Sequence, residues 1–457
     1  MKRNLIPLAV AGALGCAAAF APAAAFAQGA EIEALKAQLA ALSSRIEQLE
    51  KSQAQTTKAV EETRATSDKT ADVVAQEKSR LSFAGDLRYR NETFDVQYVD
   101  RNRNRDRVRA RLNATFRAND TVTGVLGIST GGADPRSGNQ TMTDQNARKD
   151  FDLDLAYVTW APNARWKFTA GKQRYPWQRT SAFFYDGDVN PEGIAASYSS
   201  GNFFASTFYD WLAERALSFS APTGTNTDAI MYGAQVGYRF PLSDSTKLTV
   251  AGAYFNFEGV QGYNPFFGGS SFGNTTTTSA AVCSRTLAAG TACLLSDFDI
   301  IEGFADLTTS VGGRPLRFFV DYARNTGAEV NPAVDEKLDT ALGAGVSYGA
   351  ASAAKGTWEL GVTYQQVQKD ALFGQLLDSD FGDGNTDTSG FVLRGGYTVA
   401  RNWTLNAALY LNELANEVPQ SVTVFDETTP APYDTRVIGG INDRDYKRLQ
   451  LDLNFKF

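Results

Sequence analysis

The most regular alternation of apolar and polar positions lies in the last nine residues, LQLDLNFKF. Leucine and phenylalanine occupy every odd position from 449 to 457, and polar residues occupy the even positions between them. Successive side chains of a β-strand point to opposite faces, so the segment predicts a strand with one apolar and one polar face. An apolar face toward lipid and a polar face toward a water-filled interior is typical of a transmembrane β-barrel strand. The last strand of a soluble β-sandwich is the alternative interpretation.

The C-terminal residue is itself part of this pattern. Phe455 and Phe457 lie on the apolar face, and the chain stops on the second of them. This ending resembles the C-terminal signal by which bacterial outer-membrane proteins are recognised for insertion. The resemblance implies the barrel-assembly machinery as a partner during biogenesis.

Similar alternation recurs between residues 82 and 457. In PLRFFVDYAR, for example, Leu316, Phe318 and Val320 share one face, and Arg317 and Asp321 share the other. Short connections alternate with long polar ones along this region, as periplasmic turns alternate with outer loops in outer-membrane barrels. The long connections are 131–149, 175–192, 258–296, 369–388 and 413–443.

We expect an all-β transmembrane antiparallel β-barrel of sixteen strands, a number that leaves an aqueous lumen rather than a filled interior. Weak alternation in 193–212 and 297–310 leaves fourteen or eighteen strands as alternatives. The predicted strands are 82–94, 104–118, 121–130, 151–161, 164–174, 193–199, 202–212, 229–240, 247–257, 297–310, 315–325, 338–349, 356–368, 388–399, 402–413 and 444–457.

A different period precedes the barrel. Apolar residues spaced alternately three and four positions apart fill the a and d positions of three heptads. We expect an α-helical coiled coil over 30–78, whose narrow apolar seam favours self-association, with a homotrimer as the expected assembly. A single amphipathic helix packed on the end of the barrel is the alternative. The seam residues are Ile32, Leu35, Leu39, Leu42, Ile46 and Leu49.

The first residues carry the features of an export signal. A positively charged start, an alanine-rich apolar run over 5–25 and the small-x-small triplet AFA at 25–27 describe a secretory signal peptide. We expect cleavage before Gln28, and therefore a signal peptide at 1–27, a periplasmic coiled-coil stalk at 28–80 and an outer-membrane barrel at 81–457. Lipoprotein processing at Cys16 and a retained membrane anchor are the alternatives.

Two cysteines remain beyond the signal peptide. Cys283 and Cys293 lie ten residues apart in a Gly/Ser/Thr-rich loop, where an oxidising compartment favours a disulfide. A metal site is the alternative, but two thiolates in a chain without histidine make a poor zinc site. The absence of histidine also excludes a Ser-His or Cys-His triad. A lysine-based or carboxylate-based enzyme is the remaining alternative, but the sequence shows no constellation for one, so we expect no enzyme activity, no metal and no cofactor.

Arginine occupies every odd position from 101 to 111. On a strand these side chains share one face, and each would cost a few kcal/mol at mid-depth in lipid, so the row should face the lumen. Two interpretations follow: a cationic ladder that biases ion selectivity, or a row neutralised by carboxylates that stiffens the wall. The candidate pore-lining arginines are Arg88, Arg90, Arg105, Arg107, Arg109 and Arg111.

Carboxylates that could oppose or compensate these arginines follow in two places. FDLDLAYVTW should direct Asp152 and Asp154 inward and Phe151, Leu153 and Leu155 outward. The loop 175–192 contains Asp186 and Asp188 together with five aromatic residues. A loop this rich in aromatic side chains should pack on something, and we expect it to fold into the barrel as a constriction; a contact with a neighbouring subunit is the alternative.

Residues 83–198 resemble a known family through a series of segments. These are FAGDLRYRNETF, DRNRNRDRVRARLNATFRANDTVTG, GGADPRSGNQTM, LDLAYVTWAP, TAGKQRYPW and DGDVNPEGIAASY. They are similar to the bacterial outer-membrane family of putative porins, which implies a signal peptide, often a short coiled coil, and a passive diffusion channel. The chain is more distantly similar to phosphate-selective porins, but 175–192 lacks the lysine cluster of that family.

The resemblance and the arginine row together imply an outer-membrane channel for small hydrophilic solutes that leans toward anions. Its expected partners are further copies of the chain, outer-membrane lipids, lipopolysaccharide and the solutes themselves, without nucleic acid. A structural tether that uses the stalk and an adhesin that uses the long outer loops are the alternatives.

Overall fold

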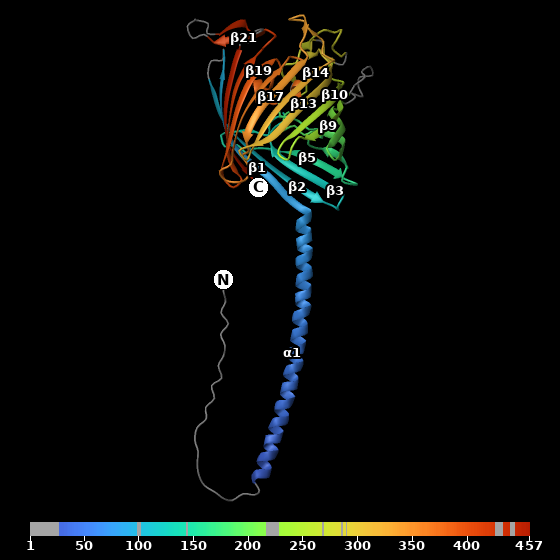
Figure 1. Ribbon diagram of the computed structural model, residues 1–457, viewed down its shortest axis with the longest axis vertical. Coiled ribbons are helices and arrows are strands. Elements are labelled where there is room, and N and C mark those ends of the chain that lie inside the picture. The colour runs from blue at the N-terminus through green and yellow to red at the C-terminus, as the bar shows by residue number, and fades with distance from the viewer. Residues whose placement is uncertain are drawn as a thin grey trace. The chain divides into compact units, whose positions relative to one another are not determined.

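The structure, a computed structural model, describes residues 27–97, 102–142, 145–215, 228–266, 269–284, 287–288, 290–425, 433–438 and 444–457. Within residues 78–457, sixteen antiparallel strands close into a β-barrel (Figure 1). All sixteen predicted strands are confirmed, with ends that agree within two residues. They are β1 (Leu81–Val96), β2 (Arg103–Arg117), β3 (Val122–Thr130), β5 (Phe151–Trp160), β6 (Trp166–Lys172), β7 (Glu192–Ser200), β8 (Phe203–Ala213), β9 (Ala229–Pro241), β10 (Lys247–Glu258), β13 (Phe298–Val311), β14 (Arg314–Asn325), β17 (Thr340–Gly349), β18 (Trp358–Val367), β19 (Thr388–Ala400), β20 (Trp403–Leu414) and β23 (Arg444–Lys456).

The barrel closes between its first and last strands. Each strand pairs with its neighbours in the chain, and β1 pairs with β23 in a register that sets Arg90 opposite Asp452 and Leu87 opposite Phe455. Closure removes the free sheet edges that would otherwise pair with other chains. It also places residues from the two ends of the sequence side by side on one wall.

The two faces of the wall differ as the alternation predicts. Leu451 on the outer face is 48% exposed, whereas Gln450 beside it on the inner face is 2% exposed. The same contrast holds on β14, where Val320 is 44% exposed and Asp321 is 5% exposed. The outward row is apolar and belongs in lipid, and the polar row lines the lumen.

One predicted orientation is wrong. Leu155 was expected on the outer face, but it is 1% exposed and lies on the inner side of the wall. The pairing of β3 with β5 shifts register between Gly127 and Ile128, so that Gly127 pairs with Leu155 and Ile128 pairs with Leu153. This β-bulge adds one residue to β5 and reverses the faces beyond it.

The long connections contain short elements of their own. β4 (Gln140–Thr141) pairs with β2, and three small hairpins lie in other loops. These are β11 (Thr276–Thr277) with β12 (Cys293–Leu294), β15 (Val330–Asn331) with β16 (Glu336–Lys337), and β21 (Gln420–Phe425) with β22 (Tyr433–Ile438). Two 3₁₀ turns, η2 (Gly374–Leu376) and η3 (Phe381–Gly384), lie in the loop between β18 and β19.

The N-terminal unit is a single helix, α1 (Ala27–Arg80). It covers the predicted helical segment, and four of the seam residues have described side chains: Leu39, Leu42, Ile46 and Leu49 are 52–68% exposed. None of the described helices is long and apolar enough to cross a membrane. The predicted signal peptide lies, except for its last residue, outside the described residues.

Candidate functional site: the lumen wall and its inward loops

The arginine row lies on the inner face of β2 and meets carboxylates there. Arg109 and Arg111 each bind Asp86 of β1, at 2.9 and 2.7 Å, and each binds Asp188 of the loop between β6 and β7, at 3.2 and 3.1 Å. Asp188 therefore compensates the row. Arg103 begins β2 and is exposed, and Arg101 lies outside the described residues.

The outer half of the row is organised around Glu92, which is fully buried on β1. Arg105 of β2 and Arg448 of β23 both bind the Glu92 carboxylate, Arg448 at 2.7 Å. Arg107 lies farther away, 3.9 Å from Glu92, and donates to the Asn139 carbonyl at 3.1 Å. Three carboxylates, Asp86, Asp188 and Glu92, thus hold most of the row, but Arg107 lacks a close anionic partner among the described residues.

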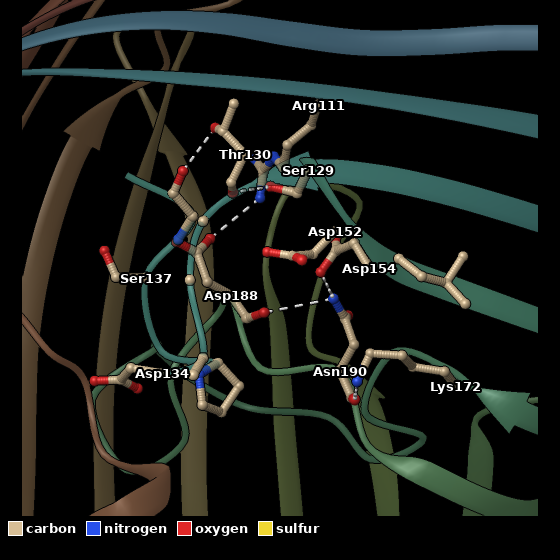
Figure 2. Close-up of a pocket in the computed structure, with 16 residues that line it drawn as sticks. Arg111, Ser129, Thr130, Asp134, Ser137, Asp152, Asp154, Lys172, Asp188 and Asn190 are labelled. Carbon is tan, nitrogen blue, oxygen red and sulfur yellow. Dashed lines mark hydrogen bonds and ion pairs between the residues drawn. The ribbon is translucent and has the colours of Figure 1, made fainter. Parts of the chain in front are cut away.

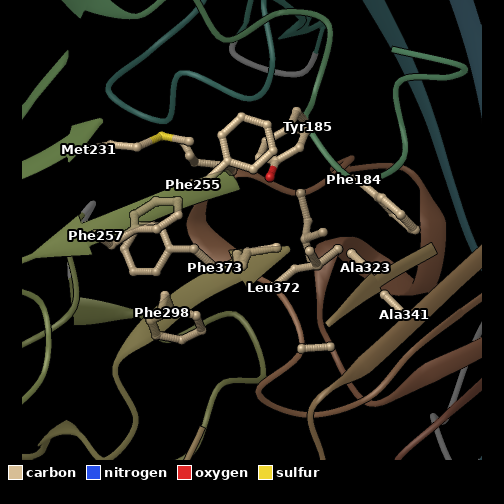
Figure 3. Packing of buried hydrophobic residues seen from close by; sticks show 14 of the residues in the cluster. Phe184, Tyr185, Met231, Phe255, Phe257, Phe298, Ala323, Ala341, Leu372 and Phe373 are labelled. Atoms are coloured by element: carbon tan, nitrogen blue, oxygen red, sulfur yellow. The ribbon is translucent and has the colours of Figure 1, made fainter. Parts of the chain in front are cut away.

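The loop between β6 and β7, residues 173–191, folds into the lumen. Trp177 stacks on Phe208 of β8 with ring centroids 4.5 Å apart, and Thr180 donates to Asp321 of β14 at 2.7 Å. Figure 3 shows Phe184 and Tyr185 of this loop among residues of the facing strands. Its aromatic side chains are covered by the barrel's own inner wall, as a constriction loop requires.

A second inward loop, residues 368–387 between β18 and β19, was expected to be an outer loop. Phe373 packs between Phe257 and Phe298 with ring centroids 5.0 and 5.3 Å away (Figure 3). The signal was present in the sequence: like 175–192, this polar loop carries several large apolar residues, namely Leu372, Phe373, Leu376, Leu377 and Phe381, and all are buried.

Asp380 joins this second loop to the arginine wall. Its carboxylate binds Arg448 at 2.8 Å and Arg90 at 3.0 Å, and Arg90 also holds Asp452 of β23 through two bonds at 2.6 and 2.8 Å. Sequence reasoning missed both Asp380 and Arg448. Arg448 could have been found, because it lies on the polar face of the final strand.

A third segment, 131–142, packs against the same wall. Asn139 accepts a 2.6 Å bond from Arg88, and Arg136 donates to the carbonyls of Gly374 and Gly384 in the second inward loop. The Arg136 guanidinium also lies 3.5 Å from the centre of the Phe272 ring. Three loops therefore meet inside the barrel and narrow its lumen.

The two inward loops between strands share a carboxylate junction. The Ser379 and Asp188 amides donate to Asp186 at 2.9 and 2.8 Å, and the Asp378 amide donates to the Phe183 carbonyl. Burial and the neighbouring Asp378 carboxylate raise the pKa of Asp186 well above its usual range. Burial and Asp380 raise the pKa of Asp378 to about 6.

Asp380 behaves oppositely to its neighbour. Burial alone would raise its pKa, but the guanidinium groups of Arg448 and Arg90 hold that pKa well below the usual range. The two guanidinium groups therefore favour the charged form of Asp380. Asp186 and Asp378 lie close together, so repulsion between their carboxylates disfavours ionisation of both at once.

Asp152 and Asp154 line a smaller cavity of about 170 Å³ beside Arg111 (Figure 2). Asp154 accepts a 2.8 Å bond from Asn190, and Asp152 is exposed to the cavity. Both lie next to the arginine row rather than across the lumen from it. Within the described residues no group of His, Cys, Asp or Glu is arranged to hold a metal ion.

A larger cavity of about 400 Å³ lies on the inner wall formed by β18, β19, β20, β23, β1 and β2. Asn, Gln, Thr and Tyr side chains supply its neutral polar surface. Three carboxylates, Glu359, Asp380 and Asp452, line it. Its basic side chains are Arg88, Arg90, Arg109, Arg111, Arg394 and Lys456.

The remaining predicted sites lie outside this cavity. Cys283 and Cys293 are joined by a disulfide with Cα atoms 5.6 Å apart, in the loop between β10 and β13. Phe455 lies on the outer face of β23 against Trp403, with ring centroids 4.9 Å apart, and Phe457 follows it at the end of the strand.

A sixteen-stranded antiparallel barrel with an apolar outer belt, a charged lumen and inward loops defines the class of outer-membrane channels. The sequence profile of the family described as "Putative porin" matches residues 93–288 and 319–427, which is more than half of the chain. The protein belongs to this family. A search of curated protein sequences finds no match.

One solved structure supports the fold, and two others are similar at a lower score. OprB of Pseudomonas putida, determined at high pH, is 12% identical with a TM-score of 0.51, and the match covers 83% of this chain and 95% of that one. OmpT of Vibrio cholerae in a trimer form is also 12% identical, with a TM-score of 0.43 and coverage of 82% and 99%. A mutant of the Rh. blastica porin is 10% identical, with a TM-score of 0.41 and coverage of 82% and 100%.

Proposed function

We propose that the barrel is a passive diffusion channel for small hydrophilic solutes in the outer membrane and that it prefers anions. The observation that carries the preference is the surplus of cations on the inner wall. The 400 Å³ cavity is lined by six basic side chains and three carboxylates. Selectivity of a pore depends on the charges that line its narrow part, and three inward loops bring that part to this wall.

Ion pairing divides the arginines into two groups. Arg109 and Arg111 are each held by two carboxylates, so they contribute mainly to the stiffness of the wall. Among the described residues, Arg88 binds the neutral Asn139 without an ion pair, and the closest carboxylate to Arg107 there is Glu92, 3.9 Å away. Arg109 and Arg111 thus fit the interpretation of a neutralised row that stiffens the wall. Arg88 and Arg107 fit the interpretation of a cationic ladder, and these two carry the ion selectivity.

The experiment is a reversal-potential measurement on the purified protein in a planar bilayer under a KCl gradient. Wild type should conduct with an anion-leaning reversal potential, and Arg107→Ser should shift it toward cation preference. Arg324→Ser is the matched control, because Arg324 lies on the outer face of β14 and is 58% exposed. A reversal potential that does not move in Arg107→Ser would contradict the assigned role of this arginine.

Export and assembly belong to the same proposal. The signal peptide is cleaved before Gln28, and α1 forms a coiled-coil stalk with copies of itself in a homotrimer. The exposed seam supports this arrangement, because the helix itself leaves the side chains of Leu39, Leu42, Ile46 and Leu49 uncovered. Lipid, lipopolysaccharide and the barrel-assembly machinery are the partners that an outer-membrane barrel of this kind needs.

A further inference from the structure

The cations that line the 400 Å³ cavity differ in whether they are already bound. Arg90 is held by Asp452 and Asp380, and Arg109 and Arg111 are held by Asp86 and Asp188. The other three, Arg88, Arg394 and Lys456, make no ion pair among the described residues. Within the described part of the chain, these three positive charges face the cavity with no carboxylate at ion-pair distance.

Each of the three has room to bind a solute. The Nε of Arg88 is buried and has no hydrogen-bond partner within the described part of the chain. Arg394 is exposed although it faces the interior of the barrel, and its contacts are the Tyr410 hydroxyl at 3.3 Å and the rings of Tyr410 and Phe183. Lys456 is also exposed.

The cations stand at two separate places along the wall. Arg394 is on β19, and Arg88 is on β1, three strands away across β20 and β23. Neighbouring strands are about 4.8 Å apart, so the two backbones are separated by about 14 Å across the strands. The register sets Arg394 level with Glu92, four residues from Arg88, which adds about 13 Å along the strands and makes the separation about 20 Å. The side chains extend into this gap from both sides. Lys456 lies at the Arg88 end, since it pairs with Asp86.

The floor between the cations carries small neutral side chains together with Asp452 of β23, whose charge is compensated by Arg90. Thr404, Asn406 and Ala408 of β20 and Asn454 of β23 line this part of the cavity. Amide and hydroxyl groups bind solute hydroxyls, and the alanine leaves space. Glu359 of β18 lies at the Arg394 end and disfavours an excess of negative charge there.

We propose that this cavity binds small hydroxylated dicarboxylates of the malate type on their way through the channel. One carboxylate binds Arg394, the other binds Arg88 and Lys456, and the hydroxyl meets the amide floor. Two separated cations fit an anion charged at both ends better than a single compact anion, and the planar guanidinium matches a carboxylate through two parallel bonds. The inference rests on the proposed channel function and specifies its substrate class.

The test is block of chloride current by L-malate in planar bilayers that contain the full-length mature protein. Malate should reduce the current with a saturable concentration dependence, and lactate and inorganic phosphate should do so much less. Arg88→Gln and Arg394→Gln should each raise the half-blocking concentration of malate about tenfold, as expected for the loss of one charged hydrogen-bond partner. Lys447→Gln is the matched control, since Lys447 lies on the outer face and is paired with Asp445.

Lys456→Gln provides a second, milder variant if Arg394→Gln fails to assemble, and it should also raise the half-blocking concentration. The inference is overturned if the channel conducts with anion preference but malate does not block it. It is equally overturned if lactate or phosphate blocks as well as malate, or if Arg88→Gln and Lys456→Gln leave the block unchanged. A folded protein without conductance would overturn the proposed function itself, and the inference with it.

Discussion

Asp380 binds the second inward loop, residues 368–387, to the arginines of the barrel wall. The substitution Asp380→Asn removes the negative charge while the side chain keeps nearly the same shape. The carboxylate makes charged bonds to Arg448 at 2.8 Å and to Arg90 at 3.0 Å. Bonds of this type contribute about 1.5–3 kcal/mol each. The Asp380 side chain is 20% exposed, and both arginines keep another carboxylate partner in the variant. We therefore take the lower value for each of the two bonds, so the loss of both should weaken the attachment of the loop by about 3 kcal/mol.

A loss of about 3 kcal/mol raises the population of the detached loop on the order of 100-fold. The loop narrows the lumen, so its detachment should appear in single-channel recordings as added current noise and as visits to a higher conductance. Glu92 and Asp452 remain to neutralise the two arginines, so the barrel itself should assemble normally. Heat-modifiable migration on gels should therefore match that of the wild type.

The matched control is Asp383→Asn, which removes a carboxylate from the same loop at an exposed position. It should leave both noise and conductance unchanged. The reasoning is refuted if recordings of Asp380→Asn are indistinguishable from wild type. It is also refuted if the conductance falls, since that would mean that the loop closes further when Asp380 is lost.

Three further predictions follow from the inward loops and the stalk. Burial and Asp380 raise the pKa of Asp378 to about 6 in the folded chain, so its ionisation destabilises the junction between the two inward loops as pH rises from about 4 through 6. Channel noise should increase over this range, and Asp378→Asn should weaken the pH dependence, leaving the part that comes from Asp186. Trp177→Ala removes the stacking of Trp177 on Phe208 and should weaken the packing of the loop 173–191 in the lumen by about 3–5 kcal/mol. The mean conductance should rise as a result. Trp211→Ala, on the outer face, should leave the conductance unchanged. Leu42→Asp combined with Ile46→Asp should abolish cross-linking between α1 helices while leaving conductance intact; persistent cross-links would contradict the coiled coil.

The number, limits and facing of the strands could be predicted because they depend on local alternation. A side chain in a strand faces either lipid or lumen, and a charged residue on the lipid side at mid-depth costs a few kcal/mol. The pattern of Leu451 and Gln450 therefore settles orientation without knowledge of neighbouring strands. Leu155 shows the limit of this reasoning, since a β-bulge is a property of two paired strands and not of one.

The inward fold of 173–191 could also be predicted, because a loop rich in aromatic residues must cover them. Asp188 could be predicted as one partner of the arginine row, but the partners that come from the far end of the chain could not. Glu92 meets Arg448 from 356 positions away only because the barrel closes β1 on β23, and Asp380 reaches the same cluster only because its loop turns inward. The sequence by itself determined the barrel and the charged face of its lumen; closure and the loop paths decided which charges are neutralised and which remain free to bind a solute.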